Sequence, residues 1–322
     1  MLEKITRRLI PASPLGLLVL IFAMVPVITN SPYKLNVASH ILVWGLFAVS
    51  FNMLWGITGM LSFGQALYYG LGAYSVGLMV DYLGSAWFLP ALAAGLLMAF
   101  LLSFLLGLLV IRVGGVYFTM LTLAFAQLAW QITFKWYDFT GGDDGIQGII
   151  PPGILQNRIV YYYFVLLLVF LSIWTLKRMA YSPFGMILRC IQQNPERIRF
   201  LGRRVRRNQL RIYMISSFFA ALAGGIMAGV DSSIHTDMLL WTTSGEAILM
   251  SVLGGISQFF GPFFGAAVFI LLEDNIGAVT EYWPLIIGSV MLFMVIIFPK
   301  GIVGEALSLK VRFGKTDTGR SS

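Results

Sequence analysis

The residues with chemically reactive side chains are few and far apart in the sequence. Cys190 is the single cysteine, which excludes an intrachain disulfide, and no Cys/His spacing typical of a metal site occurs. The two histidines are His40 and His235, and a hydrated or interfacial position is the alternative to acid–base catalysis for both. Gly314-Lys315-Thr316 matches the end of a phosphate-binding loop, but Leu309 stands where that loop requires its first glycine. We therefore expect no catalytic residue, no metal site and no ATP bound by this chain.

Another group of small and polar residues lies inside strongly apolar stretches. Segment 55–74 contains five glycines that break or thin a helix, and Ser62 and Gln65 add hydrogen-bonding groups there. We interpret it as a discontinuous helix that lines a route for a solute, with close helix packing through small residues as the alternative. The candidate route residues are Ser62, Gly64, Gln65, Thr119, Thr122, Gln127 and Glu246.

Glu246 is the one ionisable candidate for a position within the membrane. A carrier coupled to protons or sodium would need such a group, whereas a role in capping a helix is the alternative.

The composition determines what must position these residues. Apolar residues make up 58% of the 322 residues and charged ones 11%, with a mean hydropathy of +0.83, which is typical of an integral membrane protein and not of a secreted enzyme or a nucleic-acid-binding module. A membrane helix needs about 20 apolar residues to cross about 30 Å of hydrocarbon. The apolar runs predict transmembrane helices over 12–29, 37–57, 61–80, 88–111, 115–134, 160–176, 212–231 and 282–299.

Segment 242–274 does not fit a simple crossing. Gly254-Gly255, Gly261-Pro262 and Gly265 divide it into two apolar pieces that are each too short. Broken helices occur at membrane depth where the backbone is buried in protein or lines a cavity. We expect a re-entrant pair of half-helices that dips in from the outside.

The charges orient this arrangement. Segment 177–211 carries ten basic residues against one acid, Glu196, and the start and the tail are basic too. Because cytoplasmic loops collect Lys and Arg, this loop and both termini are predicted to be cytoplasmic. We thus predict an all-α integral membrane protein of about eight transmembrane helices plus the broken pair. Residues 1–304 form a single polytopic domain, with an uncleaved first helix, and 305–322 form a basic cytoplasmic tail.

The loops on the two sides have different character. In the cytoplasmic loop, Pro183 and Gly185 suit a turn, and 186–193 reads as a short amphipathic helix. Asn194 is expected to cap a second helix. An apolar stripe suits docking into a protein groove, with attraction to anionic lipid as the alternative; its members are Ile187, Leu188, Ile191, Ile198 and Leu201. The outer loop 135–159 is a turn-rich segment that could contact a solute or a receptor through Thr140, Gly141, Gly142, Asp143, Asp144 and Gly145.

Several motifs occur in order along roughly 40–304. They are Gly59-Met-Leu-Ser-Phe-Gly-Gln-Ala, Gly70-Leu-Gly-Ala-Tyr, Tyr117-Phe-Thr-Met-Leu-Thr-Leu-Ala-Phe-Ala-Gln, Thr140-Gly-Gly-Asp-Asp-Gly, Ser182-Pro-Phe-Gly, Gly245-Glu-Ala-Ile-Leu-Met, Leu253-Gly-Gly, Phe260-Gly-Pro and Gly301-Ile-Val-Gly. With these motifs the chain resembles the permease subunits of the branched-chain amino acid ABC importers, specifically the longer permease of the pair.

This resemblance implies a multi-pass permease of the bacterial cytoplasmic membrane. Its partners would be a second permease subunit, two cytoplasmic ATPases that hold ATP and Mg, and an extracytoplasmic solute-binding protein. The resemblance also implies that the cytoplasmic loop couples to the ATPases, through Ser182, Pro183, Phe184, Gly185, Arg189, Asn194, Glu196, Arg197 and Gly202. The run Arg203-Arg-Val-Arg-Arg departs from the mixed sequence usual there, and suits contacts with acidic ATPase residues or lipid.

The predicted function is inward transport of a branched-chain amino acid or a similar small solute. Sister branches of the family handle urea, short amides or other small carboxylates. A self-sufficient secondary carrier that depends on Glu246 and a membrane enzyme are the alternatives from other classes. The missing acid–base constellation argues against the enzyme.

Overall fold

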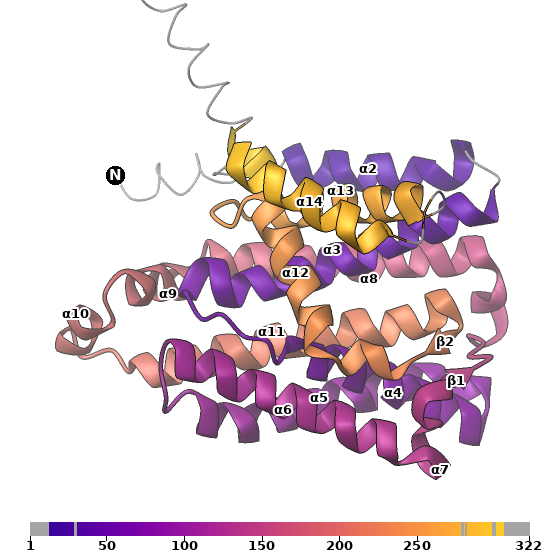
Figure 1. Cartoon of the computed structure of the whole chain (residues 1–322), viewed down its shortest axis with the longest axis horizontal. Coiled ribbons are helices and arrows are strands. Elements are labelled where there is room, and N and C mark those ends of the chain that lie inside the picture. Colours follow the sequence, from indigo (N-terminus) through magenta and orange to yellow (C-terminus); the bar gives the residue numbers. More distant parts are fainter. Residues whose placement is uncertain (1–12, 29–30, 278–279, 281, 298–300, 306–322) are drawn as a thin grey trace, which may run out of the picture.

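The computed structural model describes residues 13–28, 31–277, 280, 282–297 and 301–305, and in them the chain is a bundle of helices (Figure 1). The main helices are α2 (Ser13–Ile28), α3 (Pro32–Thr58), α4 (Gln65–Leu83), α5 (Phe88–Val110), α6 (Val116–Lys135), α8 (Arg158–Ala180), α11 (Val205–Asp231), α12 (Trp241–Gly254), α13 (Gly261–Gly277) and α14 (Trp283–Ile297). Two short helices, α9 (Pro183–Gln193) and α10 (Pro195–Phe200), project from one end of the bundle. We call this the α9–α10 end.

The opposite end carries the remaining short elements (Figure 1). They are the helix α7 (Tyr137–Thr140), the two-residue strands β1 (Ile146–Gln147) and β2 (Ser233–Ile234), and the 3₁₀ turns η1 (Ser85–Trp87), η2 (Gly142–Asp144), η3 (Gly153–Gln156) and η4 (Thr236–Leu239). The strands pair antiparallel, with Ile146 opposite Ile234, and so join two loops that are far apart in the sequence. We call this the β1–β2 end.

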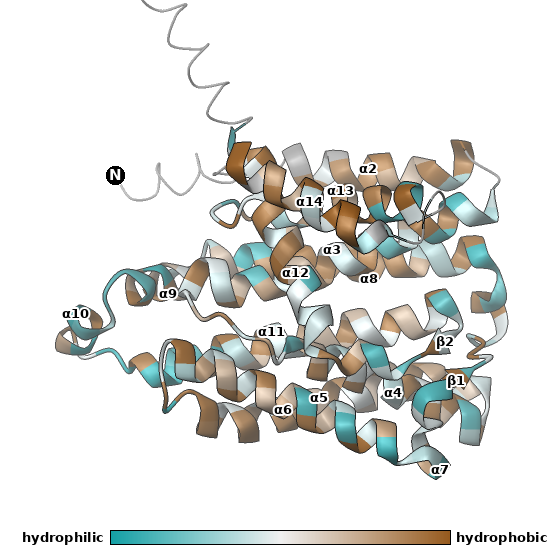
Figure 2. Ribbon diagram, viewed as in Figure 1, coloured by the Kyte–Doolittle hydropathy of each residue, from teal (hydrophilic) through white to brown (hydrophobic). Residues whose placement is uncertain are grey.

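Helix burial separates the centre of the bundle from its periphery. In the described residues, five helical segments are long and apolar enough to cross a membrane, over α3, η1–α5, α6, α8 and α11. The most apolar windows of α3 and α11 are 83% buried, whereas those of the α5 and α6 segments are 28% and 17% buried. Many apolar side chains of α5 and α6 are therefore exposed on the outside, as expected of helices that face lipid. Figure 2 shows hydrophobic residues along most helices of the bundle. The all-α membrane class is confirmed, while the number of crossings and the sidedness of the termini stay predictions.

Small residues set the spacing of the central helices. A Cβ placed on Gly224 of α11 would lie 1.8 Å from the carbonyl oxygen of Tyr69, and one on Gly72 of α4 would lie 2.0 Å from that of Ala221. The backbones of α4 and α11 thus touch through glycine in both directions. In a membrane the hydrophobic effect does not drive helices together, so close contacts through small residues are the usual basis of tight helix association.

The broken segment is confirmed as two short helices, α12 and α13, which pack on one another. A Cβ on Gly254 or Gly265 would lie 1.7 or 1.8 Å from a carbonyl oxygen of the other helix, and one on Gly261 would lie 2.2 Å from that of Gly255 in the turn. The turn between them lies beside the last turn of α3, where Asn52 Nδ2 donates to the carbonyl of Ile256 at 3.2 Å. The pair therefore extends along the bundle as far as the α9–α10 end.

Two predicted boundaries were wrong. The helix expected from residue 61 begins at Gln65, because residues 59–64 leave the helical path. Helix α11 begins at Val205, about two turns before the predicted start at residue 212, so Arg206 and Arg207 of the basic run lie in its first turn. The predicted tail 305–322 falls outside the described residues except for Glu305, as does the Gly314-Lys315-Thr316 motif.

The glycine contact between α4 and α11 can be tested by Gly224→Val. We expect the variant to lose stability at the upper end of the overpacking range, about 3 kcal/mol, because its side chain would meet the backbone of Tyr69. Gly245→Ala is the matched control, since nothing lies within 4 Å of a Cβ there. Thermal unfolding of the detergent-purified chain measures both, and equal melting temperatures would contradict the assigned contact.

Candidate functional site

The structure interrupts the chain between α3 and α4. Gly59 ends α3 with a φ of 72°, a left-handed conformation that glycine adopts without strain. Residues 59–62 have no regular structure, and a turn at 63–64 leads into α4. The predicted discontinuous helix is therefore present, as a break of six residues, 59–64, within the bundle.

Side chains of two other helices satisfy the backbone of this break. The hydroxyl of Thr119 on α6 donates to the carbonyl of Leu61 at 2.9 Å. The hydroxyl of Ser244 on α12 donates to the carbonyl of Phe63 at 2.9 Å and accepts from the amide of Ala66 at 2.8 Å. Ser244 thus replaces the hydrogen bonds that a continuous helix would supply, and it ties α12 to the start of α4.

Five of the predicted route residues meet at this junction. The amide of Gly64 donates to the Ser62 hydroxyl at 3.2 Å. A Cβ on Gly64 would lie 3.0 Å from the carbonyl oxygen of Thr122, so the glycine lets the break pass close to α6. We name Ser62, Gly64, Gln65, Thr119 and Thr122 the break cluster.

Gln65 is the unusual member of the break cluster. Its side chain is fully buried, and neither of its amide atoms has a hydrogen-bond partner among the described residues. The Oε1 atom of Gln127, further along α6, also lacks a partner in that part of the chain. Since buried polar groups are nearly always paired, unpaired ones call for an explanation such as a bound water, an ion or a functional role.

A cavity of about 520 Å³ opens near the β1–β2 end, between α3, α11, η4, α12 and α13. Among its lining residues are five acids, two histidines and two aromatic side chains: Asp231, Asp237, Glu246, Glu273, Asp274, His40, His235, Trp44 and Tyr69. We call it the acid-lined cavity. Glu246 lies in the second turn of α12 and Leu240 holds the cap position, so a capping role for this glutamate is wrong.

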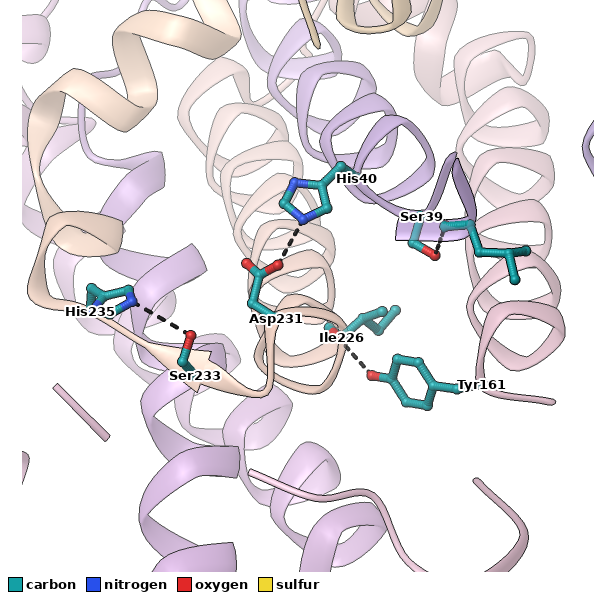
Figure 3. A network of polar contacts seen from close by, with 8 residues as sticks. Ser39, His40, Tyr161, Ile226, Asp231, Ser233 and His235 are labelled. Carbon is teal, nitrogen blue, oxygen red and sulfur yellow. Dashed lines mark hydrogen bonds and ion pairs between the residues drawn. The ribbon is translucent and has the colours of Figure 1, made fainter. Parts of the chain in front are cut away.

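A histidine–carboxylate contact at this cavity joins two central helices, and sequence reasoning missed it (Figure 3). The Nε2 atom of His40 on α3 lies 2.7 Å from a carboxylate oxygen of Asp231 at the end of α11. Nearby, the Tyr161 hydroxyl donates to the carbonyl of Ile226 at 2.7 Å. The available signal was that both residues fall at helix ends on the same predicted side. The Nε2 atom of His235 lies 3.5 Å from the hydroxyl of Ser233 in β2, two residues earlier in the chain.

The projecting α9 and α10 have the predicted caps, with one change. Asn194 caps α10 as expected, accepting from the amide of Arg197 at 3.0 Å. The turn predicted at 182–185 is instead the start of α9, because Ser182 accepts from the amide of Gly185 and Pro183 occupies the first helical turn. Gly202, with a φ of 75°, links α10 to α11.

The predicted docking stripe is wrong in its main members. Leu188 and Ile191 are buried in the core of this chain, where α9 packs against α3, α8 and α11. Met186 on α9 is exposed, and the most exposed apolar side chains are at the end of α10, where Phe200 is 90% and Leu201 74% exposed. Arg203, Arg204, Arg206 and Arg207 are exposed beside them. The surface available to a partner is thus the tip of α10 and the adjacent basic turn.

The outer loop is more ordered than its composition indicated. The Thr140 hydroxyl donates to the carbonyls of Thr133 and Trp136, which anchors the loop to the end of α6. Gly141, Gly142 and Gly145 all have positive φ. Asp143 and Asp144 are exposed, and the hydrogen bond from Tyr137 to Asp144 raises the pKa of that phenol. In the described residues, no group of three or more His, Cys, Asp or Glu side chains could hold a metal ion.

The bridging role of Ser244 can be tested by Ser244→Ala. The variant should lose about 1–3 kcal/mol of stability, because a buried amide and a buried carbonyl lose their partner. Ser251→Ala is the matched control: Ser251 is equally buried on α12 but bonds only to the carbonyl of Ala247 in its own helix. Thermal unfolding in detergent should rank Ser244→Ala clearly below Ser251→Ala, and the reverse order would exclude the bridge.

The chain is similar in sequence to known transport permeases. The chain is 26% identical to the high-affinity branched-chain amino acid transport permease LivM of Escherichia coli over 83% of this chain and 69% of the relative. It is 24% identical to a probable LivM of Methanocaldococcus jannaschii over 74% and 81%. The galactose/methyl galactoside import permease MglC of Salmonella typhimurium is 28% identical over 54% and 56%. No solved structure matches the chain significantly.

A family model described as the permease component of the branched-chain amino acid transport system matches residues 33–297. The match runs from the start of α3 to the end of α14, and so covers the break cluster, the acid-lined cavity and the projecting α9 and α10. The chain therefore belongs to the family of branched-chain amino acid transport permeases.

Proposed function

We propose that this chain is a transmembrane permease subunit of an ABC importer that moves a branched-chain amino acid, or a similar amino-acid-like solute, into the cell. The observation that carries the proposal is the family match over 33–297, which spans the helices that build the bundle. The relatives LivM and MglC are both permeases of uptake systems. The chain itself would provide the route and no catalysis.

The solute route follows the polar features of the bundle. It enters through the acid-lined cavity, where Glu246 contributes a wall, and continues to the break cluster. Ser244 supports the link, because α12 carries both this serine and Glu246 two residues later. The unpaired amide of Gln65 suits a group that exchanges partners with a passing solute. Thr119, Thr122 and Gln127 complete the route along α6.

The chemistry of the cavity favours an amino acid over a sugar. Carboxylates and the faces of Trp44 and Tyr69 both attract an ammonium group. The sugar permease MglC matches only the portion of the chain given above, whereas LivM matches most of it. Urea and short amides, which sister branches of the family handle, carry no ammonium group and would gain less from these acids.

The α10 tip supports a contact with ATPase subunits on the cytoplasmic side. Phe200 is an aromatic side chain that is 90% exposed at the last position of α10, and α10 lies beyond α9 at this end of the bundle (Figure 1). Exposed aromatic residues next to arginines are typical of the centres of protein interfaces. Two ATPases with ATP and Mg, a second permease subunit and an extracytoplasmic solute-binding protein would complete the importer in the bacterial inner membrane. A self-sufficient carrier, the alternative, would transport without ATPases and depend on Glu246.

The route can be tested by Gln65→Leu. We expect uptake of L-leucine to fall roughly tenfold, the effect of losing one hydrogen bond to the moving solute. Stability should stay equal or rise, because a buried amide without a protein partner is replaced by an apolar group of similar size. Uptake by vesicles containing the assembled importer and thermal unfolding in detergent give the two readouts. Unchanged uptake would remove Gln65 from the route.

The ATPase contact can be tested by Phe200→Asp. ATP-driven uptake and co-purification of the ATPases should both fall, roughly tenfold or more for an interface anchor. Ile154→Asp is the matched control, since Ile154 is 81% exposed at the β1–β2 end. If the chain carries solute in vesicles without ATP or partners, the importer proposal fails and the carrier alternative stands.

A further inference from the structure

A separate cavity of about 360 Å³ lies at the α9–α10 end of the bundle. Its walls come from the last turns of α3, from Tyr181 and α9, and from the turn between α12 and α13. The volume is within the range of small-molecule sites. The polar residues that line it are Asn52, Arg189, Gln192, Ser257 and Gln258. On α3, residues 52 and 56 stand about 24 Å along the helix axis from residues 36 and 40 of the acid-lined cavity.

Asn52 presents an unused hydrogen-bond acceptor here. Its side chain is 4% exposed, and Nδ2 donates to the carbonyl of Ile256 at 3.2 Å, which fixes the orientation of the amide. The Oδ1 atom has no partner in the described part of the chain. A Cβ on Gly56, which also lines the cavity, would lie 2.3 Å from this Oδ1. The glycine therefore makes room for this oxygen beside the backbone of α3.

Arg189 presents a cation to the same cavity. Its guanidinium carbon lies 5.4 Å from the centre of the Tyr181 ring, and this stacking holds the group at the wall. The described residues provide no carboxylate partner for it, and no Asp or Glu is among the cavity's described lining. A guanidinium with free donors recognises carboxylates through two parallel hydrogen bonds.

We infer that this cavity binds the head group of a zwitterionic α-amino acid, with its carboxylate on Arg189 and its ammonium group donating to Asn52 Oδ1. The inference rests on the proposed amino-acid transport for its choice of ligand. Apolar side chains of Val49, Met53 and Ile57 in the lining offer a surface for an aliphatic side chain. A bound amino acid would touch α9 and the α12–α13 turn together, so occupancy would bear directly on the helix that reaches toward the partner subunits.

Binding of radiolabelled L-leucine to the full chain in lipid nanodiscs, without ATPases, tests this site. Arg189→Gln should weaken binding at least tenfold. Arg178→Gln is the matched control and should leave binding unchanged, because Arg178 also stacks on an aromatic ring, Trp174, at 5.0 Å, but lines a different cavity. Equal affinity of Arg189→Gln and the unaltered chain, or no saturable binding by the unaltered chain, would overturn the inference.

Competition by two leucine analogues checks each half of the head group. 4-Methylpentanoate lacks the ammonium group and 3-methylbutylamine lacks the carboxylate, and each should compete at least tenfold less well than leucine. If either analogue competes as well as leucine, the paired recognition is wrong. The proposed function is judged separately by ATP-driven leucine uptake with the assembled importer: uptake without an Arg189 effect on binding refutes this site alone, whereas no leucine uptake refutes the proposed function.

Discussion

The structure depends on the need to pair every backbone polar group without help from water. Most of the described chain meets it with helices, and one interruption within the bundle is the break at 59–64. There Thr119 and Ser244, from two other helices, supply the missing hydrogen bonds. The break can exist only while α6 and α12 stay beside it, so the least regular part of the bundle is also the part that holds several helices in register.

Glycine contacts place the polar features relative to one another. The close approach through Gly72 and Gly224 packs α4 against α11, whose most apolar window is 83% buried, and α5 and α6 remain largely on the outside. Helix α3 also lies in the centre of the bundle. It lines the acid-lined cavity near one of its ends and the cavity that contains Asn52 and Arg189 near the other. The break cluster lies between α4 and α6, and α4 in turn packs against the central helix α11.

The projecting α9 and α10 divide their apolar residues between two tasks. Leu188 and Ile191 attach α9 to α3, α8 and α11, so that a displacement of α9 would also displace these helices. Phe200 and Leu201 stay exposed at the tip, where a partner can bind them. A rigidly attached base with an exposed tip suits a part that passes a partner's movement to the helices, and this is the role that the family resemblance implied for segment 182–202.

The sequence by itself determined the class of the protein, the approximate helices, the broken pair 242–274 and the cap at Asn194, because these follow from local apolar length, glycine placement and side chains within one turn. It also singled out the polar residues of the break cluster. Only the tertiary structure decided that Ser244 and Thr119 close the break, that His40 pairs with Asp231, that Leu188 and Ile191 of the docking stripe are buried, and that Asn52 shares a cavity with Arg189. Each of these joins residues distant in sequence, and periodicity along one helix carries no information about which neighbour will face it.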